Sequence, residues 1–543
     1  MYTISLLETN RPQDVEAAAR WRGAGATREH LPLLLLATLL VGVVAFRAPA
    51  VFDDRTWYDE TAVLLQSRAI HLSPWPATFK RADVMPDLSP GDVLSFVRVG
   101  PYPPGVPMLV YLFGHTDNPV RSLRWLVFFA GLALVALSYA VARSAGDGWL
   151  ALVAATYVAS STVLTHASQQ IKWTALAPLG ALLAAFLVLR SPVGEADVEP
   201  PPRRVRVRWA YILTLAVLLH THYFCLWVIA GHLLYALVWE RPRIVRTIRE
   251  LAVALVCVMP WYAFALLAQL AFVRRHFQIL AHRAVDAWNA PITVGSAARA
   301  LGYDALVGIG VQPSSYPGRY LALLLLPAIG GLTLALRSRR PERRRLALLA
   351  SACLGVAALA HTVYAAKVGN VVPLQPAYLS PWMPLTMIAV VIGVTELRQR
   401  WLRMVTVLLL VGASTVTVLM NPRFPAIVES NLPRDYAALC EAATAPASPD
   451  AALVHVSDFQ AKLLNLGCRL DAHQAIGDAG MRALPASAGR ALVVMPAGGA
   501  FDVPRGWRAS GHARQVANVM LAEYERDPAF HADADHRAWS AAP

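Results

Sequence analysis

The segment from 53 to 60 has the residue types best suited to chemistry. It places the carboxylates of Asp53, Asp54, Asp59 and Glu60 beside the aromatic side chains of Trp57 and Tyr58. A carboxylate within hydrogen-bonding distance of a hydroxyl can remove its proton, and carboxylates also bind metal ions and sugars. The structural alternative is that Asp59 caps a helix over 61–69, because Asp is a favoured N-cap. Both interpretations stay open at this point.

Two polar breaks between apolar runs carry side chains that can bind a ligand. The segment 165–173 contains Gln170 and Lys172, and a lysine there can hold a phosphate or extend its ammonium to the membrane interface. The break at 219–223 contains His220 and His222, which can ligate a metal as a pair or make polar contacts between helices. No third metal ligand stands near this pair in the sequence, which favours the polar contacts.

The composition of the chain indicates that membrane helices position these residues. The chain has 543 residues, of which 56% are hydrophobic and 15% are charged, and its mean hydropathy of +0.44 excludes a set of soluble domains. Apolar windows long enough to cross about 30 Å of hydrocarbon recur along the chain. We predict about eleven transmembrane helices, near 31–50, 123–142, 149–168, 173–190, 209–221, 223–239, 251–270, 320–337, 346–363, 379–396 and 404–420.

The net charge of +14 reflects four arginine clusters that lie between pairs of these windows. The clusters fall within 203–208, 241–249, 337–345 and 398–403. Alternating helices place all four on one side, and short loops rich in arginine stay in the cytoplasm. The charge therefore indicates topology and excludes nucleic-acid binding. We predict a multi-pass protein of the bacterial inner membrane, with a cytoplasmic N-terminus and an extracytoplasmic C-terminus.

This topology divides the chain into three parts. Residues 1–30 form a loosely ordered cytoplasmic arm, and 31–420 form the transmembrane domain, with external loops over 51–122 and 271–319. Residues 421–543 form a small extracytoplasmic α/β domain, with β-type runs at 452–456 and 491–495 and helical character at 434–441 and 515–524. Cys440 and Cys468 lie in this tail, where an oxidising compartment permits a disulfide.

The motifs together resemble a known family. Tyr58-Asp59-Glu60 follows the first span, Tyr102-Pro103-Pro104 leads into an apolar helix, Ser168-Gln169-Gln170 precedes Lys172, and Thr221-His222-Tyr223 forms the later break. In this order they resemble the integral-membrane C-type (GT-C) glycosyltransferases, in the bacterial branch similar to protein O-mannosyltransferases and lipid A aminoarabinose transferases (family 39-like). The resemblance covers about 30–420 and implies an all-α, polytopic GT-C architecture.

The resemblance also implies residue roles. It implies that Asp59 is catalytic with Glu60 as its neighbour, and that Tyr58, Tyr102, Pro103, Pro104, Gln170, Lys172, His222, Tyr223, Lys367 and Tyr378 surround the substrates. The chain departs from the family pattern at Gln170, which replaces an acid, and at Lys172, which keeps a basic position. Where the family has a late Arg-Tyr pair, this chain has Ala377-Tyr378. Lys367 can supply the positive charge that the arginine would provide.

The implied reaction transfers a sugar from a polyprenyl-phosphate donor to a lipid, glycan or protein acceptor outside the cytoplasm. A single displacement with inversion fits, with Asp59 as the base and cationic side chains on the donor phosphate. The resemblance identifies no certain cofactor and leaves a divalent metal possible. Two alternatives remain: an O-antigen ligase or polymerase using diphosphate-linked glycans, suggested by Arg274, Arg275 and His276, and a lipid or solute transporter.

Overall fold

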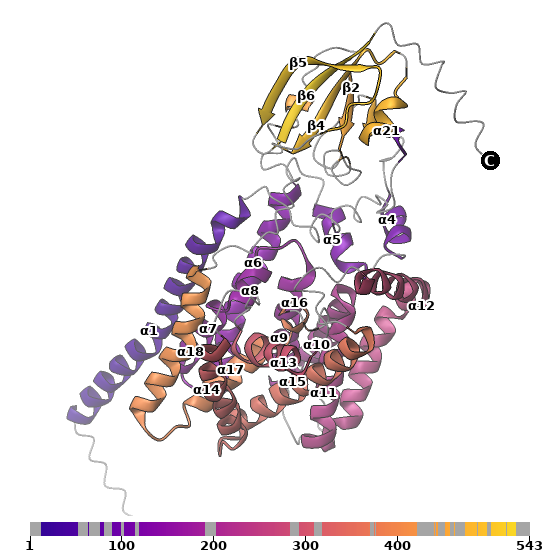
Figure 1. Cartoon of the computed structure of the whole chain (residues 1–543). Helices are drawn as coiled ribbons and strands as arrows, with labels where there is room; N and C mark the ends of the chain where they lie inside the picture. The colour runs from indigo at the N-terminus through magenta and orange to yellow at the C-terminus, as the bar shows by residue number, and fades with distance from the viewer. Residues whose placement is uncertain are drawn as a thin grey trace, which may run out of the picture.

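The structure is a computed structural model of the chain. It describes residues 12–52, 63, 76–80, 89–98, 103–113, 119–190, 202–282, 293–308, 318–369, 374, 376–420, 439, 441–443, 451–456, 461, 473–485, 487–496, 501–516 and 519–527. A helical bundle forms most of the molecule, and a small β-sheet lies at one end of it (Figure 1). Cys440 and Cys468, whose disulfide we considered, lie outside the described residues.

The bundle is built from long helices joined by short turns. Its main helices are α1 (Pro12–Val51), α6 (Pro119–Arg143), α7 (Gly148–Ala159), α8 (Thr162–Ala167), α9 (Trp173–Arg190), α10 (Pro202–Thr221), α11 (Leu226–Trp239), α12 (Ile244–His282), α14 (Gly318–Leu336), α15 (Pro341–Val368), α17 (Met383–Val394) and α18 (Arg400–Met420). Shorter pieces are α4 (Pro90–Val97), α5 (Gly105–Phe113), η1 (Tyr223–Cys225), η2 (Arg241–Arg243), α13 (Val294–Arg299), the π-helix η3 (Ala300–Val307) and α16 (Pro376–Leu379). Helix α1 begins at Pro12, so the expected loose arm over 1–30 is helical from that residue onward.

The structure supports a membrane protein without confirming eleven spans. A helix occupies each of the eleven apolar windows, and six helices of the described chain are long and apolar enough to cross a membrane. The window at 149–168 is divided because Ser160 ends α7 and the Ser161 side chain caps α8 by accepting a hydrogen bond from Leu164 N–H. Helix α10 falls outside the six, and four further apolar helices are shorter, including α7 and α17.

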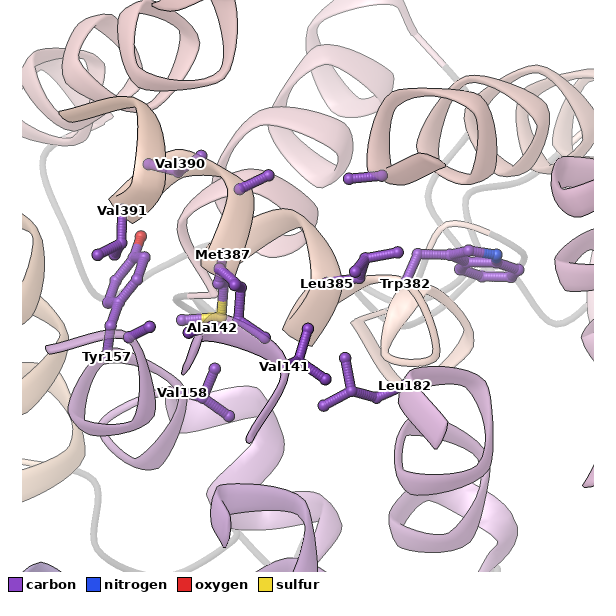
Figure 2. Close-up of a cluster of buried hydrophobic side chains, with 14 of the residues drawn as sticks. Val141, Ala142, Tyr157, Val158, Leu182, Trp382, Leu385, Met387, Val390 and Val391 are labelled. Atoms are coloured by element: carbon purple, nitrogen blue, oxygen red, sulfur yellow. The ribbon is translucent and has the colours of Figure 1, made fainter. Parts of the chain in front are cut away.

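The centre of the bundle is α17, whose residues are all buried. Figure 2 shows Met387, Val390 and Val391 of α17 among side chains from α6, α7 and α9. Its crossing with α14 is close because both helices have glycine there. A methyl group at Gly331 would lie 2.7 Å from the Val390 carbonyl oxygen, and one at Gly393 would overlap the Gly331 carbonyl. Such close backbone approach is the usual way that membrane helices pack.

Ion pairs join the arginine clusters at the end of the bundle away from the sheet. Arg208 and Arg246 both contact Glu250 Oε1 at 2.9 Å. Arg345 reaches Glu240 Oε1 at 2.7 Å, and Arg343 reaches Glu396 Oε1 at 2.8 Å. These contacts connect loops from all four clusters, so the prediction that the clusters share one side is confirmed.

The sheet at the other end has six strands in the order β1-β3-β2-β4-β6-β5. Its strands are β1 (Thr78–Phe79), β2 (Ala451–His455), β3 (Gln474–Ile476), β4 (Arg490–Pro496), β5 (Trp507–Val516) and β6 (Val519–Arg526). The two predicted β-type runs are β2 and β4, which pair in parallel. Val454 and Val493 pack on one face with Met481 of α21 (Gly477–Arg482), while other strand residues pack with Leu439 on the second face. The unit is therefore a small α/β layer, as predicted.

The helical prediction for 515–524 is wrong, because these residues form the hairpin of β5 and β6. Val516 pairs with Val519, and Gln515 pairs with Met520. Residues such as Met520, Leu521 and Ala522 have good helix propensity. Pairing with β4 and burial of Val519 and Leu521 in the sheet override that propensity.

Strand β1 comes from the first loop, several hundred residues before its partner β3. Thr78 pairs with Ala475, and the Ile476 N–H donates to the Ala77 carbonyl at 2.9 Å. The Phe79 ring stacks on the His455 ring with centroids 6.4 Å apart. The first loop and the tail therefore share one sheet.

We expect acid to weaken this junction through His455. His455 is fully buried, its Nε2 lies 2.8 Å from Gln474 Oε1, and burial lowers its pKa to about 4 from 6.5. Because the folded pKa is depressed, its stabilising contribution is complete above pH 6.5 and is lost as pH falls towards 4, up to about 3 kcal/mol. The protection factors of the amides in 451–455 and 474–476, which are corrected for the intrinsic pH dependence of exchange, should therefore fall over this range.

The comparison variant is His455→Phe, which carries no titrating group at this position. The amide protection factors of this variant should depend less on pH than those of the wild type. His512 is exposed, so the control variant His512→Gln should behave as the wild type. An unchanged pH profile in His455→Phe would show that another group is responsible.

Candidate active site

Eight side chains form a polar and aromatic group at the sheet-facing end of the bundle, called here the Lys172 group. Its members are Lys172, Trp173, His222, Phe224, His361, Tyr364, Tyr378 and Trp382. They come from the start of α9, the break between α10 and η1, the last turns of α15, and the segment from α16 to α17. Three of the predicted site residues, Lys172, His222 and Tyr378, are therefore brought together.

Lys172 is a buried cation beside two aromatic rings. Its side chain is 3% exposed, and Nζ lies 6.0 Å from the Trp173 ring centroid and 5.9 Å from that of Tyr378. Ring faces attract a cation, but a buried ammonium is costly unless an anion or hydrogen-bond acceptors compensate it. The faces of these two rings therefore help to stabilise a cation at this buried position.

His222 contributes a neutral imidazole to the same group. The backbone N–H of Phe224 donates to Nδ1 at 3.1 Å, so Nδ1 carries a lone pair and Nε2 carries the proton. Burial, followed by the charges of Lys172 and His361, holds the pKa of His222 well below its ordinary value. The ring is a neutral N–H donor at neutral pH.

The aromatic rings pack on one another and fix both polar residues. The Trp173 and His222 centroids are 4.0 Å apart, and Trp173 stacks on Tyr378 at 5.6 Å. Phe224 makes edge contacts with His361 at 4.7 Å and Tyr378 at 5.1 Å. In the described part of the chain, the buried indole N–H groups of Trp173 and Trp382 have no acceptor. The group therefore offers donors to a ligand rich in oxygen.

Arg47 ties the end of α1 to the segment that precedes Lys172. Its guanidinium is buried and donates to the Ala159 carbonyl at 2.7 Å, Thr165 Oγ1 at 2.8 Å and Ser168 Oγ at 3.2 Å. This places the last turns of α1, which lead into the first loop, beside the 165–173 segment.

The proline element lies on the other flank of the break at His222. Pro103 and Pro104 are buried, and the Met108 N–H donates to the Pro104 carbonyl at 2.8 Å as α5 begins. Gly105 lies so close to the His220 backbone that a methyl group would overlap the His220 carbonyl. This contact holds the start of α5 against the His220 backbone, two residues before His222 in the chain.

Other predicted residues lie apart from the Lys172 group. Tyr223 faces α12, where its hydroxyl accepts from Trp261 Nε1 at 3.4 Å and its ring meets Tyr262 edge-on at 5.5 Å. Lys367 is exposed in the last turn of α15. Gln170 is buried in the turn before α9, and its carbonyl accepts from the Lys172 N–H at 2.8 Å.

The acidic candidates Asp59 and Glu60 lie outside the described residues, as do Trp57, Tyr58 and Tyr102. Val63 is described and is 1% exposed, in a cluster that includes Ile171 and Trp173. Val63, four residues after Asp59, therefore lies in the same buried cluster as the start of α9.

Sequence reasoning missed Arg47, His361 and Trp382. Arg47 and His361 each stand within an apolar window, and an ionisable residue inside such a window is a signal of function or of a specific pairing. Trp382 carried no comparable signal. Among the described residues, no three His, Cys, Asp or Glu side chains are grouped to hold a metal.

Comparison with known proteins shows a likeness of fold. No protein-family model and no curated protein sequence matches the chain. The ArnT protein of Cupriavidus metallidurans in the apo state superposes with a TM-score of 0.53 at 14% identity, covering 93% of this chain and 98% of ArnT. The same protein bound to undecaprenyl phosphate gives 0.50 at 14%, covering 90% and 97%. The apo oligosaccharyltransferase of Archaeoglobus fulgidus gives 0.50 at 12%, covering 87% and 70%.

Proposed function

The chain has the fold of the GT-C membrane glycosyltransferases, and we propose that it transfers a sugar from a polyprenyl-phosphate donor to an acceptor at the sheet-facing side of the membrane. The observation that carries this proposal is Lys172, a buried cation beside the stacked rings of Trp173 and Tyr378 at that end of a GT-C bundle. The ArnT structure with bound undecaprenyl phosphate supports the donor class.

The Lys172 group suits a sugar phosphate in two ways. The Lys172 ammonium can make a charge-assisted hydrogen bond to a phosphate oxygen while the polyprenyl chain stays among the helices and lipid. The rings of Trp173 and Tyr378, with the Nε2–H of His222, can pack on and donate to a sugar.

Asp59 is the proposed base. The acceptor oxygen loses its proton to the Asp59 carboxylate and bonds to the anomeric carbon, while the bond from that carbon to the phosphate oxygen breaks and polyprenyl phosphate leaves. One displacement inverts the anomeric centre. Val63 belongs to the same hydrophobic cluster as Trp173, and four residues of chain span at most about 14 Å, so covalent geometry is compatible with Asp59 near the Lys172 group.

The arginine clusters support an orientation. They share the end opposite the sheet, and the positive-inside rule assigns that end to the cytoplasm. The proposed site then faces outward in a bacterial inner membrane, with the C-terminal sheet outside.

The test of this proposal compares donors with the purified full chain. We expect sugar transfer from a polyprenyl monophosphate sugar to an acceptor extract, and no transfer from the matching polyprenyl diphosphate glycan. Transfer from the diphosphate alone would instead favour a ligase or polymerase. Vesicle transport without sugar transfer from either donor would overturn the enzyme assignment.

A further inference from the structure

A pocket lies at the end of the bundle opposite the sheet, where α10, α11 and α12 meet. It encloses about 470 Å³ of empty space, its open mouth included, and its lining includes Arg208, Tyr211, His232, Arg243, Arg246 and Glu250. The residues at the proposed sugar-transfer site are at the other end of these helices, so the pocket is separate from it.

The pocket wall carries more positive than negative charge. Arg208 and Arg246 share Glu250, while Arg243 and Arg345 share Glu240 at 2.9 and 2.7 Å. The lining thus has three guanidinium groups and two carboxylates, and Arg345 reaches Glu240 from outside the lining, which leaves an excess of positive charge. Guanidinium groups beyond those needed for internal pairing favour an anion with several oxygens, and phosphate is the usual one.

His232 provides an unpartnered buried donor in this lining. It is 2% exposed, its Nδ1 lies 2.8 Å from the Tyr211 hydroxyl, and within the described chain its Nε2 has no hydrogen-bond partner. If Tyr211 donates to Nδ1, the proton of the neutral ring is on Nε2. That tautomer pairs the Tyr211 hydroxyl and leaves an N–H that a ligand oxygen can satisfy.

The helices that line the pocket also carry an apolar outer surface. Trp209 and Leu213 of α10 are 53% and 57% exposed, and Val245 and Ile248 of α12 are 57% and 50% exposed. Exposed side chains of this kind face acyl chains in a membrane, and tryptophan is enriched at the lipid headgroup level. The pocket is therefore flanked by surface suited to a lipid tail.

We propose that this pocket binds the phosphate of an anionic phospholipid from the adjacent leaflet. The phosphate oxygens accept from Arg208, Arg246 and His232 Nε2, and the acyl chains lie along the outer faces of α10 and α12. Basic pockets between membrane helices on the cytoplasmic side are a known form of lipid headgroup site. This inference does not depend on the sugar-transfer proposal.

The test titrates the full chain in detergent with phosphatidylglycerol and measures the midpoint of thermal unfolding, because a bound ligand raises that midpoint. We expect phosphatidylglycerol to raise it and phosphatidylcholine not to. An equal effect of both lipids would overturn the proposal. So would an equal effect of inorganic phosphate alone, which would show that the ligand is a free anion.

Variants locate the effect. Arg246→Gln leaves Arg208 to pair with Glu250 and should weaken apparent phosphatidylglycerol affinity about 10-fold. Arg344→Gln is the matched control, because Arg344 is exposed and outside the lining; an equal loss there would indicate general surface attraction and overturn the site. Thr247→Trp keeps every charge but fills the pocket, so retained affinity in this variant would also overturn it.

Discussion

Replacing Asp59 with asparagine is expected to slow sugar transfer by about 10²–10⁴-fold, the usual contribution of a positioned general base. Asparagine keeps the shape of the side chain but cannot take the acceptor proton. Donor binding should remain near the wild-type value, because the donor phosphate is assigned to Lys172. Initial rates at saturating donor, with donor affinity measured in parallel, separate these two quantities.

The matched control is Asp53→Asn, which makes the same change six residues earlier in the same loop. It should retain most of the transfer rate. A folded, inserted Asp59→Asn protein with wild-type transfer would rule out Asp59 as the base, and a collapse of rate in Asp53→Asn alone would move that role to Asp53.

The Lys172→Met variant should bind polyprenyl phosphate about 10- to 100-fold more weakly, since a hydrogen bond to a charged group contributes about 1.5–3 kcal/mol. Methionine is of similar length and apolar, so it can occupy the space beside the stacked rings of Trp173 and Tyr378 without a charge. The measurement is equilibrium binding of polyprenyl phosphate to the purified variant. Lys172→Arg keeps the charge and should recover part of the affinity.

Lys367→Met is the control for this variant, because Lys367 is exposed and belongs to the same end of the bundle. Its donor affinity should match that of the wild type. If Lys367→Met loses affinity and Lys172→Met does not, the donor phosphate is held by Lys367 at the end of α15. Lys367 would then supply the positive charge that is missing at Ala377.

The sequence was sufficient to predict the helices and part of the site. Hydrophobic windows locate helices because crossing lipid requires long apolar runs, and every window became a helix. Lys172 and His222 were identified because polar residues at helix ends stand out against apolar runs. Their contact through Trp173 depends on how α9 and α10 pack, which a single sequence does not specify.

Three features were beyond sequence reasoning for separate physical reasons. The two-residue strand β1 has no periodic pattern, and it exists only because β3 offers a pairing edge. The hairpin of β5 and β6 is set by sheet pairing against local helix propensity. His361 lies inside an apolar window of the sequence. Its contacts with Phe224 and Trp382 depend on how the end of α15 packs against neighbouring elements, which the sequence does not specify.

The pairing of Thr78 with Ala475 sets an order of events during biosynthesis. A ribosome completes β1 long before it reaches β3, so β1 in the first loop has no strand partner until nearly the whole chain has been made. A chain truncated before Gln474 would insert its helices but leave this loop unanchored. The junction of β1 with β3 is therefore complete only in chains that extend through Ile476.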